Sequence, residues 1–283
     1  MPSMTTTRKL VIFTDLDGTL LDPDTYSFEP ATSALDLVRR KGIPLVLSSS
    51  KTRAEIELYR RKLGNNHPFV SENGGAVFIP RRYFSFGISC DREVKDYCVL
   101  ELGTFYPRMI QVLESVKKES GISIKGFSDL TAEELASLSR LTLEEAVFAK
   151  QREYDEAFIV EGGEEEVETV RRKIEQKGLR YVRGGKFHHI LGKNDKGKAV
   201  GVLKGLYENE FSPVTTIGIG DGLNDLPMLH AVDHPVLLRD GKDSSLSIPP
   251  EIQGLDIIEG TGPLAWNQAI LGLLGKLNLI DQE

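Results

Sequence analysis

Cysteine is scarce in this sequence: Cys90 and Cys98 are the two cysteines among 283 residues. Two cysteines do not make the dense framework of bridges that small secreted proteins use, so we expect no disulfide scaffold and a reducing, cytoplasmic location. Long apolar runs are also lacking, and the polar, threonine-rich N-terminus does not have the form of a secretion signal. We therefore expect no membrane-spanning segment.

An excess of basic residues is lacking too, since 35 lysines and arginines stand against 42 aspartates and glutamates, a net charge of −7. This balance argues against a nucleic-acid partner, which needs a basic surface. It does not exclude a small anionic substrate, because a local group of lysines and a bound metal can outweigh the global charge. The 40% of hydrophobic residues are typical of a globular protein of one large domain or two. The composition does not show whether the protein is a monomer or an oligomer.

The most informative stretch lies near the N-terminus, where an apolar run ends in two carboxylates. Residues 11–14 predict a buried parallel strand, and Asp15 and Asp17 follow it, with Gly18 allowing a tight turn. The carboxyl ends of parallel strands form the ligand crevice of open α/β sheets. Two neighbouring acids repel each other, so either a divalent cation or a proton must stabilise them. The alternative is an ordinary Asp-rich turn.

The first third of the chain alternates short apolar segments with helical ones. Strands are expected at 11–14 and 43–47, and helices at 30–41 and 53–63. This alternation predicts a parallel sheet with right-handed crossovers. Residues 69–79 add two short strands around an Asn-Gly turn.

The pattern changes near residue 88 and returns near residue 193. Helices are expected at 106–118, after Thr131 and after Thr142, where capping boxes occur, and at 164–177; strands are expected at 157–160 and within 179–191. The parallel-sheet pattern then resumes with helix 196–209, strand 214–219, helix 226–231, strand 235–238 and helix 264–277. The fold class is therefore α/β: a parallel-sheet core of residues 1–87 and 193–283 with an inserted α+β module, 88–192.

Four groups of polar residues fall at predicted strand ends or helix starts, where one sheet edge could bring them together. Acids at such an edge supply the oxygen ligands that Mg²⁺ prefers, with substrate phosphate completing its coordination. A hydroxyl at a helix start and a lysine can hold phosphate oxygens. The four groups are Asp15 and Asp17, Ser49, Lys196, and Asp221 with Asn224 and Asp225.

These residues resemble the four motifs of the haloacid dehalogenase superfamily of phosphohydrolases. FTDLDGTL at 13–20, Ser49, Lys196 and GDGLND at 220–225 stand in the motif order of that superfamily. The resemblance implies a Rossmann-like core, a cap domain formed by the inserted module, and Mg²⁺ as cofactor. It implies that Asp15 is the nucleophile and Asp17 the acid and base, that Ser49 and Lys196 assist, and that Asp15, Asp17 through its carbonyl, Asp221 and Asp225 form the metal site.

A narrower resemblance, to mannosyl-3-phosphoglycerate phosphatases, rests on SSKT at 49–52, SENGG at 71–75, AKQREYDEAF at 149–158 and GGKFHHILGKNDKGKAV at 184–200. It implies hydrolysis of a small phosphorylated sugar acid whose carboxylate needs a cation. Lys51 replaces the arginine common after the second motif in the superfamily, a feature that the narrower family shares. The candidate substrate-binding residues are Ser49, Ser50, Lys51, Lys196, Asn224, Arg152, Arg183, Lys186 and His188.

Other interpretations stay open from the sequence. Each candidate residue of the inserted module taken alone has a solvated or structural role as its ordinary alternative. The rival functions are another sugar phosphatase (of the sucrose, trehalose or glucosyl-phosphoglycerate type), a phosphomutase, and a binding protein without activity on the same scaffold. The presence of every motif acid and of Lys196 argues against the last.

Overall fold

The computed structural model describes residues 9–184, 186–240 and 252–277, which build two sheets with helices on both faces. The larger sheet has nine strands in the order β13-β12-β11-β1-β2-β3-β4-β6-β5, and the smaller has four in the order β7-β8-β10-β9. The predicted α/β class, with a mainly parallel core and an inserted module, is confirmed.

The parallel part of the large sheet carries the strands that the sequence predicted, extended at one edge by a strand that it did not predict. Its six members are β1 (Lys9–Thr14), β2 (Leu45–Ser48), β3 (Phe69–Ser71), β11 (Val214–Gly220), β12 (His234–Arg239) and β13 (Asp256–Glu259). Because β1 pairs in parallel with both β2 and β11, the ends of these three strands meet at one edge.

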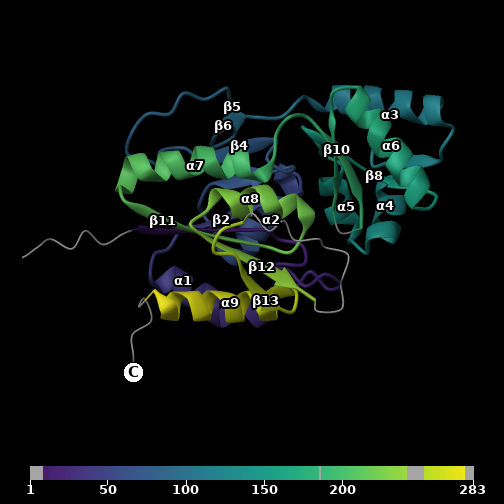
Figure 1. Cartoon of the computed structure of the whole chain (residues 1–283). Coiled ribbons are helices and arrows are strands. Elements are labelled where there is room, and N and C mark those ends of the chain that lie inside the picture. The colour runs from purple at the N-terminus through teal and green to yellow at the C-terminus, as the bar shows by residue number, and fades with distance from the viewer. Residues whose placement is uncertain (1–8, 185, 241–251, 278–283) are drawn as a thin grey trace, which may run out of the picture.

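Helices cover both faces of this sheet (Figure 1). Along β1 the side chains alternate: Leu10 and Ile12 belong to one buried cluster, Val11 and Phe13 to the other. The first face is covered by α1 (Thr32–Arg40), α2 (Arg53–Leu63) and α9 (Gly262–Lys276), the second by α7 (Lys196–Phe211) and α8 (Leu226–Ala231). A 3₁₀ turn at Glu29–Ala31 replaces the predicted first turn of α1.

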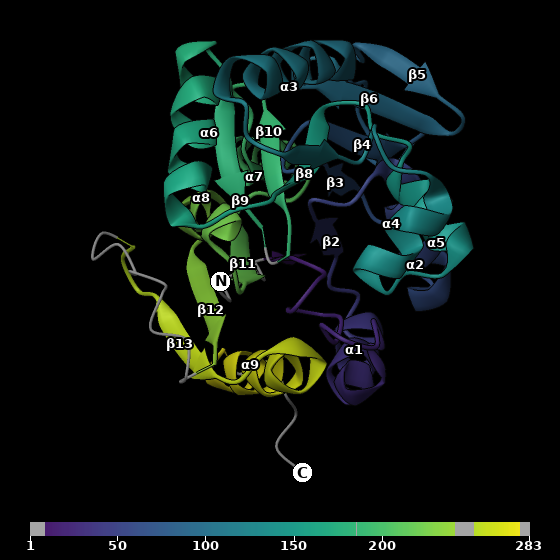
Figure 2. The ribbon, with the colours of Figure 1, turned by 90° about the vertical axis from the view of Figure 1, so that its right-hand side faces the viewer.

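The inserted module is a second α+β unit beside the sheet edge (Figure 2). The antiparallel strands β7 (Ile124–Gly126), β8 (Asp155–Val160), β10 (His188–Leu191) and β9 (Arg180–Arg183) form its sheet. Buried side chains of α3 (Tyr106–Ser120) and α6 (Glu164–Gln176) pack with Phe158, and those of α4 (Ala132–Ser139) and α5 (Leu143–Ala149) pack with Ala157. Both predicted capping boxes are present, at Thr131 and Thr142.

Three further strands extend the large sheet in antiparallel fashion: β4 (Ala76–Pro80), β6 (Tyr97–Glu101) and β5 (Arg92–Val94). The predicted boundary at residue 88 precedes β5 and β6, although both pair within the core sheet. We therefore propose that the inserted module begins after Glu101 and ends near Leu191.

Cys90 and Cys98 form a single disulfide, which links the segment before β5 to β6. The sequence separates these residues by eight positions, and the β5–β6 hairpin brings them together. The sequence analysis did not predict the β5–β6 hairpin, so it did not predict that the two cysteines lie next to each other. The cytoplasmic location that was inferred from scarce cysteine stays a prediction.

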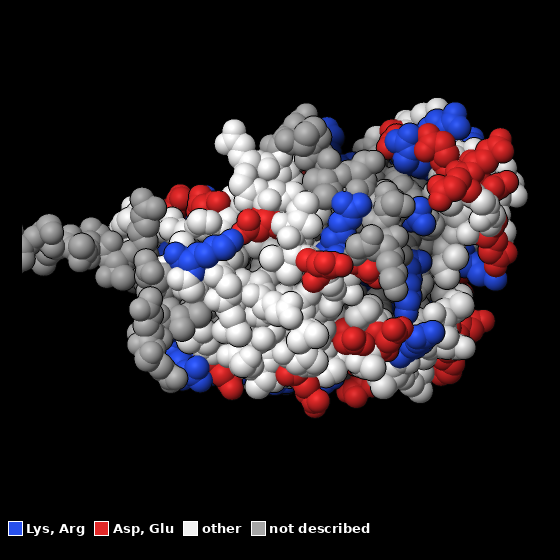
Figure 3. Space-filling view, turned by 60° about the horizontal axis from the view of Figure 1, so that its bottom comes forward, with Lys and Arg blue, Asp and Glu red and all other residues white. Residues whose placement is uncertain are grey.

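Within the described part of the chain, no helix is long and apolar enough to cross a membrane. On the face shown in Figure 3, basic and acidic side chains are interspersed and do not gather into one basic patch.

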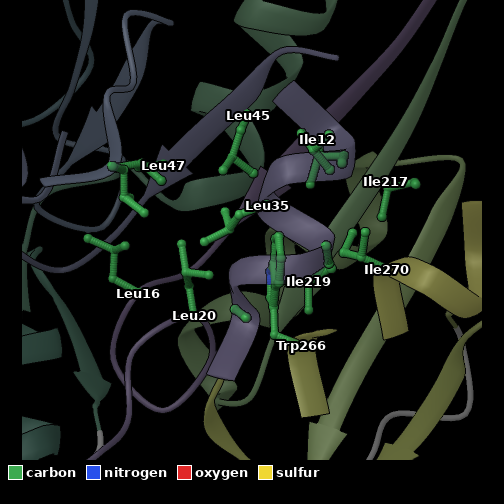
Figure 4. Packing of buried hydrophobic residues seen from close by; sticks show 14 of the residues in the cluster. Ile12, Leu16, Leu20, Leu35, Leu45, Leu47, Ile217, Ile219, Trp266 and Ile270 are labelled. Carbon is green, nitrogen blue, oxygen red and sulfur yellow. The ribbon is translucent and has the colours of Figure 1, made fainter. Parts of the chain in front are cut away.

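Trp266 lies at the centre of the cluster on the α9 face, among Ile12, Leu20 and Ile219 (Figure 4). It is fully buried, and its indole N–H donates to Thr14 Oγ1 at 3.0 Å. Thr14 ends β1 and immediately precedes Asp15. The core packing therefore supports the strand end that carries the first motif.

We predict that Trp266→Phe lowers the free energy of unfolding by about 1 to 3 kcal/mol, because it leaves a void and removes the hydrogen bond to Thr14. Denaturant unfolding measures this change. Leu264→Ala, at an exposed position of the same helix, is the control and should change the value by less than about 0.5 kcal/mol. Equal losses in the two variants would contradict the packing role of Trp266.

Candidate active site

A buried lysine joins the first and fourth motifs. Lys196, the first residue of α7, is fully buried, and its Nζ lies 2.7 Å from Asp15 Oδ1 and 2.5 Å from Asp225 Oδ1. Burial alone would lower the pKa of Lys196, but the two carboxylates outweigh it and raise the pKa above the ordinary value. The side chain is therefore a permanent cation at the strand end.

Three carboxylates form a cluster, and two of them contact this lysine. Each of Asp15, Asp221 and Asp225 offers a ligand oxygen, and these oxygens lie within 4.8 Å of one another. Burial and the neighbouring carboxylates raise the pKa of Asp15 well above its usual range, and burial and Asp225 raise that of Asp221 to about 7. One lysine does not neutralise three acids, and an all-oxygen set suits a hard divalent cation. The cluster therefore fits a divalent metal.

The loops around the cluster fix its geometry. Thr19 Oγ1 donates to Asp221 Oδ1 at 2.7 Å, and Asp225 Oδ2 accepts the backbone N–H groups of Asp221 and Gly222. Gly18 has φ +76°, and a Cβ there would lie 2.4 Å from Asp221 Oδ2. The first motif thus needs glycine because the fourth motif passes directly against it.

Asp17 and Lys51 form an ion pair at the edge of the cavity. Lys51 Nζ lies 3.0 Å from Asp17 Oδ1 and 3.6 Å from a Glu55 oxygen, and its side chain is almost wholly buried. The ammonium also lies 5.0 Å from the ring centre of Tyr26. Burial would lower the pKa of Lys51, but Asp17 and Glu55 raise it above its usual value. Lys51 therefore contacts the predicted acid directly.

The second motif supplies backbone and hydroxyl groups near this pair. Ser49 is fully buried, and its hydroxyl accepts the N–H of Lys51 at 3.2 Å, whereas Ser50 lines the cavity. Thr52 caps α2 in a capping box with Glu55. Asn224, in the 3₁₀ turn Leu223–Asp225, also lines the cavity and donates to Asn73 Oδ1.

One cavity of about 540 Å³ connects the acid cluster with the inserted module. Its core side includes Asp15, Asp17 and Asp221. Its other side is lined by both charged and apolar residues of the inserted module, namely Phe127, Ser139, Leu141, Ala149, Arg152, Ala157, Glu164, Arg183, Lys186, Phe187 and His189. A ligand that filled this space would contact both units.

The predicted residues of the inserted module differ in their surroundings. Arg152 is buried and donates to the backbone oxygens of Ser50 and Asp155. Arg183 and Lys186 are exposed, and Arg183 lies 3.3 Å from Glu164. His188 is not among the lining residues; its Nδ1 lies 2.6 Å from Tyr181 Oη. The structure thus brings the two exposed cations to the cavity and leaves His188 outside it.

Four polar residues that the sequence analysis did not propose for the site lie where the core and the inserted module meet. Asp155 and His189 form a buried pair, and Asn73 Nδ2 donates to Asp155 Oδ2 at 2.8 Å. Glu72 accepts the backbone N–H groups of residues 153–155. The SENGG segment at 71–75 and the two histidines at 188–189 were noted in the sequence as parts of the family resemblance. Which of the two histidines faces the cavity depends on the strand register.

Comparison with known proteins agrees with this geometry. Residues 12–252 match the haloacid dehalogenase-like hydrolases. The chain belongs to this family. It is 50% identical over 274 residues (96% of this chain, 100% of the relative) to a glucosyl-3-phosphoglycerate/mannosyl-3-phosphoglycerate phosphatase of Methanococcoides burtonii. It is 38% identical over 233 residues (81% of this chain, 91% of the relative) to a mannosyl-3-phosphoglycerate phosphatase of Pyrococcus furiosus.

A solved phosphatase of the same superfamily from Bacteroides thetaiotaomicron shares the fold, with a TM-score of 0.64, 18% identity and coverage of 99% of this chain and 98% of that one. Family and relatives together identify the chain as a phosphoric monoester hydrolase, as the four motifs predicted. The resemblance to mannosyl-3-phosphoglycerate phosphatases is confirmed at the level of the relatives' names.

We predict that Lys196→Gln reduces phosphatase activity to below about 1% of the wild-type value and lowers the free energy of unfolding by about 2 to 4 kcal/mol, since buried Asp15 and Asp225 lose their cation. Activity assays and denaturant unfolding measure these effects. Lys198→Gln is the control, because Lys198 lies in the same helical turn with an exposed side chain. If Lys196→Gln had the same activity and the same free energy of unfolding as Lys198→Gln, the role of Lys196 as the cation of the acid cluster would be refuted.

Proposed function

We propose that this phosphatase hydrolyses mannosyl-3-phosphoglycerate to mannosylglycerate and phosphate. The observation that carries the proposal is that the cavity of about 540 Å³ joins the motif acids to Arg183 and Lys186 of the inserted module. A glycosyl-phosphoglycerate carries a phosphate, a carboxylate and a sugar, so it requires anion sites at two places. The names of the two relatives support the same substrate class.

In the proposed reaction, a carboxylate oxygen of Asp15 attacks phosphorus while the bond from phosphorus to the substrate oxygen breaks. Asp17 enters this step in its protonated form and gives the proton to the departing alcohol. A water molecule then attacks the aspartyl-phosphate, Asp17 takes a proton from that water, and the Asp15 carboxylate is released with inorganic phosphate. Lys196 stabilises the charge at Asp15, and Ser49 and Ser50 belong to the phosphate-binding loop.

We propose Mg²⁺ as the metal, held by the carboxylates of Asp15 and Asp221 and by the backbone carbonyl of Asp17. Asp225 supports the site by orienting Lys196 and the loop at Asp221. When bound, the metal reduces the repulsion between the phosphate and the attacking carboxylate. The three-acid cluster and the family both favour a divalent ion.

For the substrate carboxylate we propose Arg183, assisted by Lys186. A guanidinium group can bind a carboxylate in a bidentate manner. Arg183 has one exposed ion-pair partner, Glu164, with which a ligand can compete. Arg152 is less suitable because its donors already bind the backbone of Ser50 and both the backbone and the carboxylate of Asp155.

A second candidate substrate is glucosyl-3-phosphoglycerate, because the Methanococcoides burtonii relative is named for both sugars. Mannose and glucose differ in the direction of one hydroxyl, and a single hydrogen bond discriminates between them by about 1 to 3 kcal/mol at most. Activity on both sugars is therefore compatible with the same phosphate and carboxylate sites.

The substrate prediction is tested by phosphate release over a panel of p-nitrophenyl phosphate, 3-phosphoglycerate, sucrose phosphate, trehalose phosphate and the two glycosyl-phosphoglycerates. We expect kcat/KM for mannosyl-3-phosphoglycerate to exceed that for the disaccharide phosphates at least about tenfold. Asp15→Asn should abolish release from every substrate, because an amide forms no acyl phosphate. Asp36→Asn, on the outer helix α1, is the control. A preference for a disaccharide phosphate would overturn the substrate and leave the phosphatase class intact.

The metal prediction is tested by chelation. Removal of divalent ions should reduce turnover of p-nitrophenyl phosphate to about 1% or less, and added Mg²⁺ should restore it. Asp221→Ala should raise the Mg²⁺ concentration needed for half-maximal activity at least about tenfold. Undiminished activity in excess chelator would exclude a metal-dependent mechanism.

A further inference from the structure

A buried Asp–His pair lies on the side of the cavity formed by the inserted module, and the proposed phosphoryl chemistry does not use it. His189 lines the cavity and is 5% exposed, and Asp155 is fully buried. His189 Nδ1 lies 3.0 Å from both carboxylate oxygens of Asp155. Burying two such groups is unfavourable unless their polar atoms are satisfied, so the pair calls for an explanation.

The pair is held from both units of the protein. Asn73, in the core turn after β3, donates to Asp155 Oδ2 at 2.8 Å, and Arg152 Nη2 lies 3.2 Å from Oδ1. Arg152 also donates to the backbone oxygen of Ser50 in the second motif. These contacts fix the carboxylate of Asp155, and through it they fix the plane of the His189 ring.

The contacts also determine which nitrogen carries the proton. Burial works to raise the pKa of Asp155, but Arg152 and His189 outweigh it and hold the pKa below the usual range. An ionised carboxylate only accepts hydrogen bonds, so Nδ1 of His189 must be the donor. In the tautomer with the proton on Nδ1, Nε2 carries a lone pair that can accept a hydrogen bond, and no side chain of the described residues bonds to it.

Part of the cavity lining that includes His189 is apolar. Phe127 and Phe187 meet edge to face with their ring centres 4.8 Å apart, and Leu141 and Ala157 lie on the same lining. A sugar ring has an apolar C–H face and a rim of hydroxyl groups. An aromatic wall with one fixed acceptor matches both features, because it packs against the first and binds one hydroxyl of the second.

We propose that His189, oriented by Asp155, recognises the sugar of the substrate by accepting a hydrogen bond from one of its hydroxyl groups at Nε2. The inference rests on the proposed function and assigns its sugar-binding residue. A carboxylate has no proton to donate to Nε2, so the glycerate group belongs with Arg183 and Lys186. Asn73, Arg152 and Asp155 are positioning residues that keep the acceptor in place.

His189→Phe removes the acceptor and keeps a planar ring among apolar neighbours. We expect kcat/KM for mannosyl-3-phosphoglycerate to fall about 10- to 100-fold, mainly through KM, which is the range of one lost hydrogen bond. The fold-loss in kcat/KM should be at least about tenfold larger for this substrate than for 3-phosphoglycerate, which has the carboxylate and no sugar. His188→Phe is the matched control, because the neighbouring ring lies outside the cavity, and it should lack this selective effect.

Asp155→Asn provides a second test that does not rely on the first variant folding. The amide can donate to Nδ1, which moves the ring proton to Nε2 and removes the acceptor while the ring stays. We expect the same selective loss on the glycosylated substrate, with thermal unfolding to verify the fold. In an Asp15→Asn background, calorimetry should show weaker binding of mannosylglycerate with either change.

The outcomes separate the inference from the proposed function. If wild-type protein prefers another sugar phosphate, the proposed substrate falls, and the same comparison is made on the preferred sugar. If His189→Phe loses activity equally on 3-phosphoglycerate and on the glycosylated substrate, or if it matches His188→Phe on both, sugar recognition by His189 is overturned. A normal affinity of mannosylglycerate for the His189→Phe variant would overturn it as well.

Discussion

The contact of Lys196 with Asp15 and Asp225 is the constraint on which the rest of the site depends. Three carboxylates in a buried space of a few ångströms repel one another, and this lysine is the cation that lies between two of them. It links the start of α7 to the end of β1 and to the loop after β11, segments far apart in the sequence. The same contact therefore joins segments of the core and places a cation beside the Asp15 carboxylate.

A second constraint joins the inserted module to the core. The turn after β3 places Glu72 and Asn73 at positive φ, where Glu72 accepts backbone N–H groups of residues 153–155 and Asn73 holds Asp155. Residues held in this sparsely populated region persist when their surroundings fix them. The turn thus fixes the position of residues 153–155 of the inserted module relative to the core motifs.

Local signals in the sequence predicted local structure well. The capping boxes at Thr131 and Thr142 begin helices, and Gly64 ends α2 with positive φ, as the residue types require. Strand ends followed by acids also predicted that these acids meet at one edge of the sheet, where Asp15, Asp221 and Asp225 lie together. Strand pairing outside the parallel part of the sheet was not predicted: β5 and β6 pair within the core sheet, and their hairpin brings Cys90 and Cys98 together.

The sequence by itself determined the chemistry, because a strand followed by Asp15 and Asp17, a lysine at a helix start and a GDGLND loop can meet at the edge of a parallel sheet in few ways. The sequence could not determine which of the two adjacent histidines, His188 or His189, lines the cavity. His189 pairs with Ala157 and His188 with Phe158 across the small sheet, and successive side chains of a strand point to opposite faces. A shift of one residue in that register would exchange the two rings. Tertiary packing decided the register, since Phe158 belongs to the cluster under α3 and α6 and Ala157 to the cluster under α4 and α5.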